Sequence, residues 1–301
     1  MTASQTGIAG VLGEIGDRDA LTATPAADEH VTILEAGRAQ RNYWSDLWRY
    51  RELFTILAWR DLTLRYKQTV IGVAWGIIRP LATVAVFTVV FSRVARLQSD
   101  GMVPYALMVF AGMLPWTLLS NILGQASGSL LNSANLIGKI YFPRLILPAA
   151  AVAVVLVDTG VSLLLLLAMM VWFGILPDWR IAFLPAFLAL AVLAGFGPAL
   201  WLAAINVKYR DFQYIVGFVL QFGLYLSPVG FSSTAIPAQW RLVYSLNPAV
   251  GVIDGFRWSL LRGSAPLYPP ALLLSIAITA FMLWAGIAYF RKAENTFSDV
   301  I

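Results

Sequence analysis

Two charged residues inside apolar runs are placed where they could act on a ligand or on each other. Arg79 precedes Pro80 in the middle of one apolar run, and Asp158 is the acid inside another. An arginine at the centre of a membrane-spanning helix costs roughly 2.5–3.5 kcal/mol on insertion scales, so its side chain should face protein or water. Two arrangements fit the sequence: an Arg79–Asp158 ion pair, or contact between Arg79 and a substrate.

The residue patterns of enzymes are missing from the sequence. It has no G-x-x-x-x-G-K-[ST] nucleotide loop, no H-E-x-x-H or G-x-S-x-G motif and no cysteine. The single histidine, His30, has no neighbours that would complete a metal site. We therefore predict a protein that is not an enzyme, with no catalytic residue, no metal site and no bound cofactor of its own.

Composition predicts an all-α integral membrane protein. The chain is 59% hydrophobic and 12% charged, whereas soluble domains average roughly 45–50% apolar and about 25% charged residues. The net charge of +5 could suggest nucleic acid, but the basic residues cluster at the ends of apolar runs. We read this cluster as a topological signal and expect no nucleic-acid partner.

Six runs are long and apolar enough to predict membrane spans. They are residues 70–92, 103–130, 145–176, 181–205, 212–231 and 271–290. Lysines and arginines are concentrated on the side of the N-terminus, at residues such as Arg60, Lys139 and Arg210. This distribution places both termini in the cytoplasm.

The rest of the chain divides by composition. Residues 1–40 are rich in acids and small residues and predict a disordered cytoplasmic tail. Residues 41–66 interleave tryptophans with charges and predict an amphipathic helix in contact with membrane lipids. Residues 67–291 hold the six-span domain, and 292–301 form a cytoplasmic C-terminal tail.

The polar segment 132–144 is predicted to be a two-faced helix between the second and third spans. Leu136, Ile137 and Ile140 would share one face and Asn132, Asn135 and Lys139 the opposite face. A proline at 143 ends the helix, because the residue before a proline resists the α conformation. The charge distribution puts this segment in the cytoplasm, where a partner protein could bind it.

Four blocks of sequence then carry a resemblance to a known family. They are residues 60–75 (RDLTLRYKQTVIGVAW), 112–116 (GMLPW), 135–144 (NLIGKIYFPR) and a fourth that runs from NVKYRD at 206–211 through LSP at 226–228 to LNP at 246–248. In this order and spacing the chain resembles the permease subunit of type-2 ABC exporters for polysaccharides, O-antigen and teichoic acids. The resemblance covers roughly residues 52–263.

The resemblance implies a homodimer bound to two copies of a separate ATPase, which would hold the ATP and Mg. It also implies that 132–144 is a coupling helix that docks on the ATPase, with Leu136, Ile137 and Ile140 as the docking face and Lys139 and Arg144 at its rim. An ordinary solvated loop is the alternative. The residues assigned to coupling are Asn135, Leu136, Ile137, Lys139, Ile140, Tyr141, Phe142, Arg144, Arg210 and Asp211.

The resemblance also assigns a substrate path and a gate. In relatives the position of Arg79 is more often uncharged, so Arg79 departs from the family pattern; it would meet the pyrophosphate or sugar of a substrate. Residues 232–262, broken by Gly and Pro, would form re-entrant gate helices on the external side, between spans five and six, with Arg241, Asn247 and Arg257. The channel residues would be Trp75, Arg79, Phe87, Phe91, Trp116, Phe222 and Tyr225.

These features predict the channel-forming permease of an ATP-driven exporter in the bacterial cytoplasmic (inner) membrane. Its substrate would be a lipid-linked polysaccharide of the O-antigen, capsule or teichoic-acid type. Two alternatives stay open: an ABC permease for a drug or small lipid, and a membrane-embedded enzyme of glycan assembly. The enzyme would need a catalytic carboxylate near a membrane face, for which Asp211 and Asp254 are the candidates.

Overall fold

Helix α4 (Tyr105–Asn132) is the element on which most of the others pack. The computed structural model describes residues 43–67, 70–94, 96, 103–139, 141–294 and 297, without the side chains of 70–75, 93 and 94. The chain divides into Met1–Tyr43, of which only Tyr43 is described, and Trp44–Ile301, which contains the architecture below. The predicted N-terminal tail, 1–40, lies outside the described residues.

Within the described residues every regular element is helical, as the composition predicted. In chain order these are α1 (Tyr43–Arg49), α2 (Arg51–Tyr66), α3 (Val70–Phe87) with its π-helical continuation η1 (Thr88–Val94), α4, α5 (Ala134–Ile137), α6 (Ile146–Trp172), the 3₁₀ turn η2 (Trp179–Phe183), α7 (Leu184–Lys208), α8 (Phe212–Leu226), the 3₁₀ turn η3 (Ser233–Ala235), α9 (Ala238–Tyr244), α10 (Pro248–Leu260) and α11 (Pro269–Glu294).

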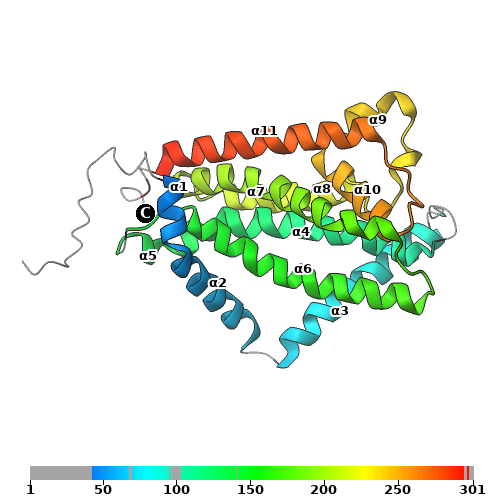
Figure 1. The fold of residues 1–301 in the computed structure, drawn as a ribbon, viewed down its shortest axis with the longest axis horizontal. Helices are drawn as coiled ribbons and strands as arrows, with labels where there is room; N and C mark the ends of the chain where they lie inside the picture. The colour runs from blue at the N-terminus through cyan, green and yellow to red at the C-terminus, as the bar shows by residue number, and fades with distance from the viewer. Residues whose placement is uncertain are drawn as a thin grey trace, which may run out of the picture. The chain divides into compact units, whose positions relative to one another are not determined.

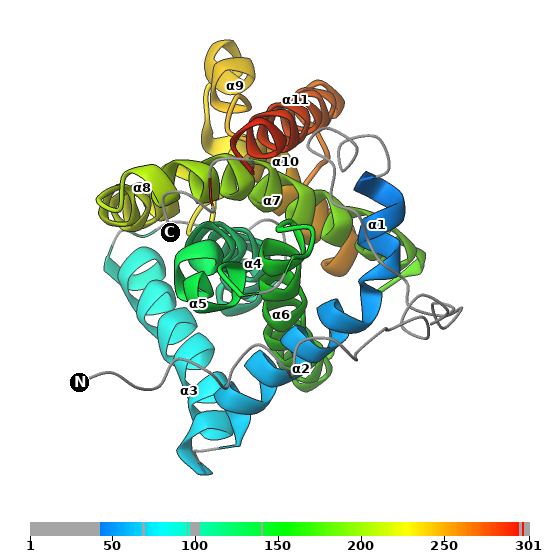
Figure 2. The same ribbon diagram turned by 90° about the vertical axis from the view of Figure 1, so that its left-hand side faces the viewer.

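Helices α4, α6, α7 and α11 run side by side (Figures 1 and 2). The most apolar window of α4 is 72% buried and that of α11 only 22%, so α4 is central and α11 peripheral. Helix α6 runs antiparallel to α4, α7 and α11. The C-terminal ends of α4, α7 and α11 and the N-terminal end of α6 therefore meet at one end, where α5 also lies (Figure 1).

Four of the six predicted spans are helices long and apolar enough to cross a membrane: α4, α6, η2 with α7, and α11. The first and fifth predicted spans correspond to shorter apolar helices, Gly76–Ser92 and Phe212–Leu226. Helix α6 ends earlier than predicted, because Gly174 adopts the left-handed conformation (φ 71°) that commonly terminates helices.

Helix α8 is shorter than the predicted span 212–231 because of Pro228. The residue before it, Ser227, is extended (φ −104°, ψ 150°), as expected for a residue that precedes proline. At about 1.5 Å per residue the 15 residues of α8 measure about 22 Å. A bilayer core is about 30 Å thick, so α8 alone falls short of it.

The predicted helix 41–66 is two helices rather than one. Helices α1 and α2 meet at Tyr50, and α2 packs along α6. Leu57 is buried, whereas Trp48, Ile56 and Trp59 are exposed. This exposed apolar side is the one available to lipid.

Helices α7 and α11 approach so closely at two glycines that neither has room for a side chain. A Cβ on Gly286 would overlap the carbonyl oxygen of Gly197, and a Cβ on Gly197 would lie 2.7 Å from the backbone nitrogen of Leu283. Small residues at such crossings let helix backbones pack directly in membrane proteins.

We expect Gly286→Leu to separate α7 from α11. The change should lower the free energy of unfolding by about 1–3 kcal/mol or more, because the overlap is with backbone that cannot rotate away. Thermal unfolding of the detergent-solubilised protein would measure it. Gly160→Leu is the matched control, since a Cβ there meets nothing within 4 Å; equal losses at both positions would contradict the argument.

Candidate functional site

The loop between α4 and α6 contains one turn of helix and not the longer helix that was predicted. Helix α5 ends at Ile137 and is followed by Gly138, whose flexibility disfavours a continued helix. Residues 141–143 have no regular structure, and Pro143 keeps Phe142 out of the α conformation. Ile140 lies outside the described residues.

The exposed side of the loop is opposite to the predicted docking face. Ile137 is 6% exposed and Phe142 is 3% exposed, so both pack inside the chain and are not available to a partner. Leu136 is half-buried. The residues that project from the loop are polar or amphipathic: Asn132, Asn135, Lys139 and Tyr141.

Arg144 and Tyr141 lie against the C-terminal end of α11. The backbone N–H of Arg144 donates to Glu294 Oε1 at 2.7 Å. Arg144 is therefore bonded to α11 of the same chain, whereas the prediction placed it at the rim of a docking surface. Burial, together with the nearby carboxylates of Glu294 and Asp46, raises the pKa of the Tyr141 hydroxyl. Tyr141 therefore stays neutral at physiological pH.

A second exposed turn lies at the same end, between α7 and α8. Arg210 and Asp211 are both exposed there. Asn206, in the last turn of α7, is fully buried and donates to the carbonyl of Ser127 on α4 at 2.9 Å. This bond holds the α7–α8 turn close to the loop that contains α5.

Asp158 is paired with residues at the end of α2 and not with Arg79. Arg65 Nη1 lies 2.8 Å from Asp158 Oδ2, and the Tyr66 hydroxyl donates to Oδ1 at 2.5 Å. Of the two arrangements considered for Arg79, the ion pair is therefore not the one found. Arg79 is exposed on α3.

The predicted channel residues do not share one surface. Trp116 is buried, with 7% of its surface exposed. It packs against Gly223, where an added Cβ would lie 2.6 Å from the indole ring. Phe87 and Phe91 are half-buried and in contact with each other, with ring centroids 5.3 Å apart. The side chain of Trp75 lies outside the described residues.

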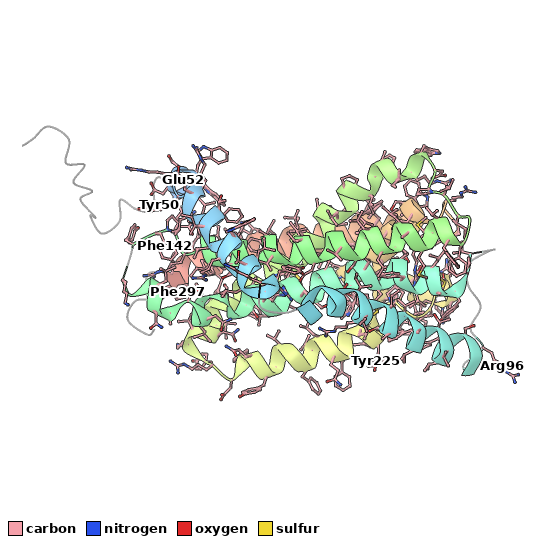
Figure 3. The ribbon with its side chains drawn as sticks, turned by 90° about the horizontal axis from the view of Figure 1, so that it is seen from below. Tyr50, Glu52, Arg96, Phe142, Tyr225 and Phe297 are labelled. Carbon is pink, nitrogen blue, oxygen red and sulfur yellow. The ribbon has the colours of Figure 1, made fainter. Side chains whose placement is uncertain are left out.

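Phe222 and Tyr225 belong to an exposed aromatic stripe on α8. The stripe consists of Tyr214, Phe218, Phe222 and Tyr225, which are 81%, 61%, 51% and 63% exposed. Phe218 and Phe222 stack with centroids 4.3 Å apart. Tyr214 and Phe218 were not predicted, although their spacing of four residues places them on one helix face with Phe222. Figure 3 shows Tyr225 on α8, which lies along the border of the helix group in that view.

At the opposite end from α5, the buried side chain of Arg257 joins three elements. It is fully buried on α10. Its Nε donates to the carbonyl of Met108 on α4 at 3.2 Å, and Nη1 and Nη2 donate to Phe231 and Val229 at 2.9 and 2.7 Å. Gly112 leaves the space for it, since a Cβ on Gly112 would lie 2.7 Å from Nη2.

Other side chains hold the same 227–231 segment, which we call the α8–η3 turn. The Tyr105 hydroxyl donates to the carbonyl of Gly230. Asn247 caps α10 by accepting from Ala249 N–H at 3.0 Å, and its Nδ2 donates to Ser227 Oγ at 3.0 Å. Two residues assigned to the gate, Arg257 and Asn247, thus stabilise this turn through hydrogen bonds. The third, Arg241, bonds the carbonyls of Thr234 and Ile236 just before α9.

A small cavity of about 100 Å³, lined by both polar and apolar residues, lies under α9, bounded by α10 and the start of α11. Arg241, Tyr244 and Asp254 are among the residues that line it. Burial and the Asp254 carboxylate raise the pKa of Tyr244. The space suits a few water molecules. Among the described residues, no three His, Asp or Glu side chains gather as a metal site would require.

Comparison with known proteins assigns the chain to a family. Residues 52–261 match the ABC-2 type transporter family. The chain belongs to this family. Three relatives are each named O-antigen export system permease protein RfbA. The relative from Myxococcus xanthus is 28% identical over 258 residues, and this alignment covers 85% of this chain and 98% of the relative. Two from Klebsiella pneumoniae are 25% and 22% identical, each over 83% of this chain and 95% of its own.

Membership of the ABC-2 type transporter family makes the chain a multi-pass membrane permease and implies that it works with an ATPase subunit. The matched stretch starts in α2 and ends just after α10. It includes both the loop that contains α5 and the Arg257 contacts, which lie at opposite ends of α4. Helix α11 falls outside it.

We expect Arg257→Gln to destabilise the permease strongly. Each buried carbonyl that loses its donor costs about 1–3 kcal/mol, and the carbonyls of Phe231 and Val229, which lie outside any helix, both accept from Arg257. The measurement is thermal unfolding in detergent. Arg241→Gln is the control, because Arg241 is partly exposed and water can replace its bonds. If Arg257→Gln unfolded like the control, Arg257 would not hold the turn.

Proposed function

We propose that this permease is the channel-forming subunit of an exporter that moves a lipid-linked polysaccharide across the bacterial cytoplasmic membrane. The observation that carries the proposal is that three relatives named as O-antigen export permeases align with nearly their whole length. A separate ATPase would supply the energy. Both termini would lie in the cytoplasm, and ATP and Mg would bind to the ATPase alone.

The ATPase would dock at the end that carries α5. The exposed residues Asn135, Lys139 and Tyr141 form its contact surface in this proposal, with Arg210 and Asp211 from the second turn beside them. This surface is polar, projects beyond the ends of α4 and α6, and lies at the end where basic residues are concentrated. Those properties support a protein partner in the aqueous phase.

A second copy of the chain would complete the substrate path. Helices α3 and α8 both pack on α4 and expose apolar side chains, among them Ile78 and Val86 on α3 and the aromatic stripe on α8. In the proposed homodimer these surfaces face each other around the path. Aromatic rings suit the apolar C–H faces of sugars, and Arg79 suits their anionic groups. Helices α9 and α10 would form the external gate.

The proposal predicts that ATP hydrolysis belongs to a partner. The purified chain alone should show no ATPase activity, and ATPase subunits co-expressed with it should co-purify in equal number. Size-exclusion chromatography with an ATPase assay measures both. Hydrolysis by the isolated chain at a rate stoichiometric with its amount would contradict the proposal.

The exposed position of Arg79 predicts a role in transport and not in stability. We expect Arg79→Gln to reduce polysaccharide export, because the positive charge on the path is lost, while the yield of folded protein stays unchanged. Export is measured as surface polysaccharide in cells whose own permease gene is deleted. The reverse result, normal export with a lower folded yield, would assign Arg79 a structural role.

A further inference from the structure

Arg144 connects the loop that contains α5 to the C-terminal end of α11. Its backbone N–H donates to Glu294 Oε1 at 2.7 Å, and its Nη1 donates to the main-chain carbonyl of Glu294. Its guanidinium also lies over the ring of Phe297, 5.8 Å from the centroid. We call these contacts of Arg144, Glu294 and Phe297 the C-terminal latch.

The chemistry of a helix end explains why these groups meet. The last carbonyls of a helix lack partners within the helix, and a cation near them is favoured by the helix dipole. The Arg144 guanidinium supplies both a donor and a positive charge at the end of α11. The Glu294 carboxylate, which the dipole disfavours at this position, accepts a backbone N–H from the loop.

Phe297 anchors the latch inside the chain. Its side chain is 1% exposed and stacks edge-to-face on Phe290, with centroids 5.5 Å apart. Phe142 of the loop is also buried, and Figure 3 shows Phe142 and Phe297 at the same end of the structure. The inner side of the loop is thus bound to α11, while Asn135, Lys139 and Tyr141 remain exposed on the outer side.

The opposite end of α11 packs on α10, the helix that carries Arg257. The packing is close, since a Cβ on Gly251 of α10 would overlap Ser275 of α11. Between these ends, the 26 residues of α11 form a rod about 39 Å long. This helix therefore connects the loop at one end of the structure to α10 and the α8–η3 turn at the other.

We propose that the C-terminal latch makes α11 part of the coupling element. Glu294 and Phe297 are positioning residues: a movement imposed on the outer side of the loop by a bound ATPase is passed through Arg144 to α11, and along α11 to α10. This proposal rests on the proposed function, because it requires an ATPase at the loop. It adds a second route beside the direct ones through α4 and α6.

The test uses the full-length permease in complex with its ATPase, with the variants Glu294→Ala and Phe297→Ala. We expect both variants to keep the ATPase bound and hydrolysing ATP, while polysaccharide export falls roughly fivefold or more, the size of a typical coupling between sites. Lys292→Ala is the matched control, because Lys292 is exposed in the same helical turn. Its export should equal that of the wild type.

A covalent crosslink across the latch distinguishes a loss of coupling from a loss of folding. The chain has no cysteine, so Arg144→Cys combined with Phe297→Cys introduces a single thiol pair. The uncrosslinked double variant should be uncoupled, and a short bismaleimide crosslink should restore export. If Phe297→Ala does not fold, Glu294→Ala still decides the question, because it leaves the buried ring of Phe297 in place.

Three results would overturn the latch: wild-type export by both alanine variants, loss of ATPase binding in parallel with export, or no recovery on crosslinking. The second result would make the latch a docking surface and not a transmitter. A wild-type chain that binds no ATPase is a different outcome, and it would overturn the proposed function itself. The two proposals therefore fail in distinguishable ways.

Discussion

A chain that crosses a bilayer must satisfy its backbone hydrogen bonds internally, and this structure meets that requirement at one conspicuous break. Helix α8 stops at Leu226, and the five residues of the α8–η3 turn have no helical ladder. Three side chains from two other helices replace it: Tyr105 of α4, Asn247 at the start of α10 and Arg257 within α10. The position of α10 on α4 depends on this exchange, because Arg257 bonds both the turn and α4 at once.

The same contacts explain motifs that are distant in the sequence. Gly112 belongs to the second block of the family resemblance, and Ser227-Pro228 and Asn247-Pro248 are distant parts of the fourth. They nevertheless meet at Arg257 or one contact away from it. Gly112 provides room, Pro228 breaks the helix, and Asn247 holds the broken end. Residue type alone could not predict these roles. Gly112 makes room for Arg257 and Asn247 bonds Ser227, and in each case the partner lies far away along the chain.

Hydrophobic length and residue type were enough to predict an all-helical membrane protein and the positions of α4, α6, α7 and α11. They were insufficient where a tertiary partner decides. The distance between Arg79 and Asp158 along their helices allowed a pair, but Arg65 and Tyr66 reach Asp158 because α2 packs along α6. The loop 132–144 has helical periodicity, yet Gly138 and Pro143 limit it to one turn, and burial of Ile137 and Phe142 turns its apolar side inward. Nothing in the sequence pattern connects Arg144 with Glu294, 150 residues later.

The shortness of α8 has a consequence for the surrounding lipid. A helix about 22 Å long cannot match a hydrocarbon layer about 30 Å thick, so lipid chains beside α8 must shorten, tilt or bend to cover it. The length of α8 therefore favours a locally thinned bilayer next to it. In the proposed exporter, a large head group that crosses along this helix would meet a narrower hydrophobic barrier than it would meet elsewhere in the membrane.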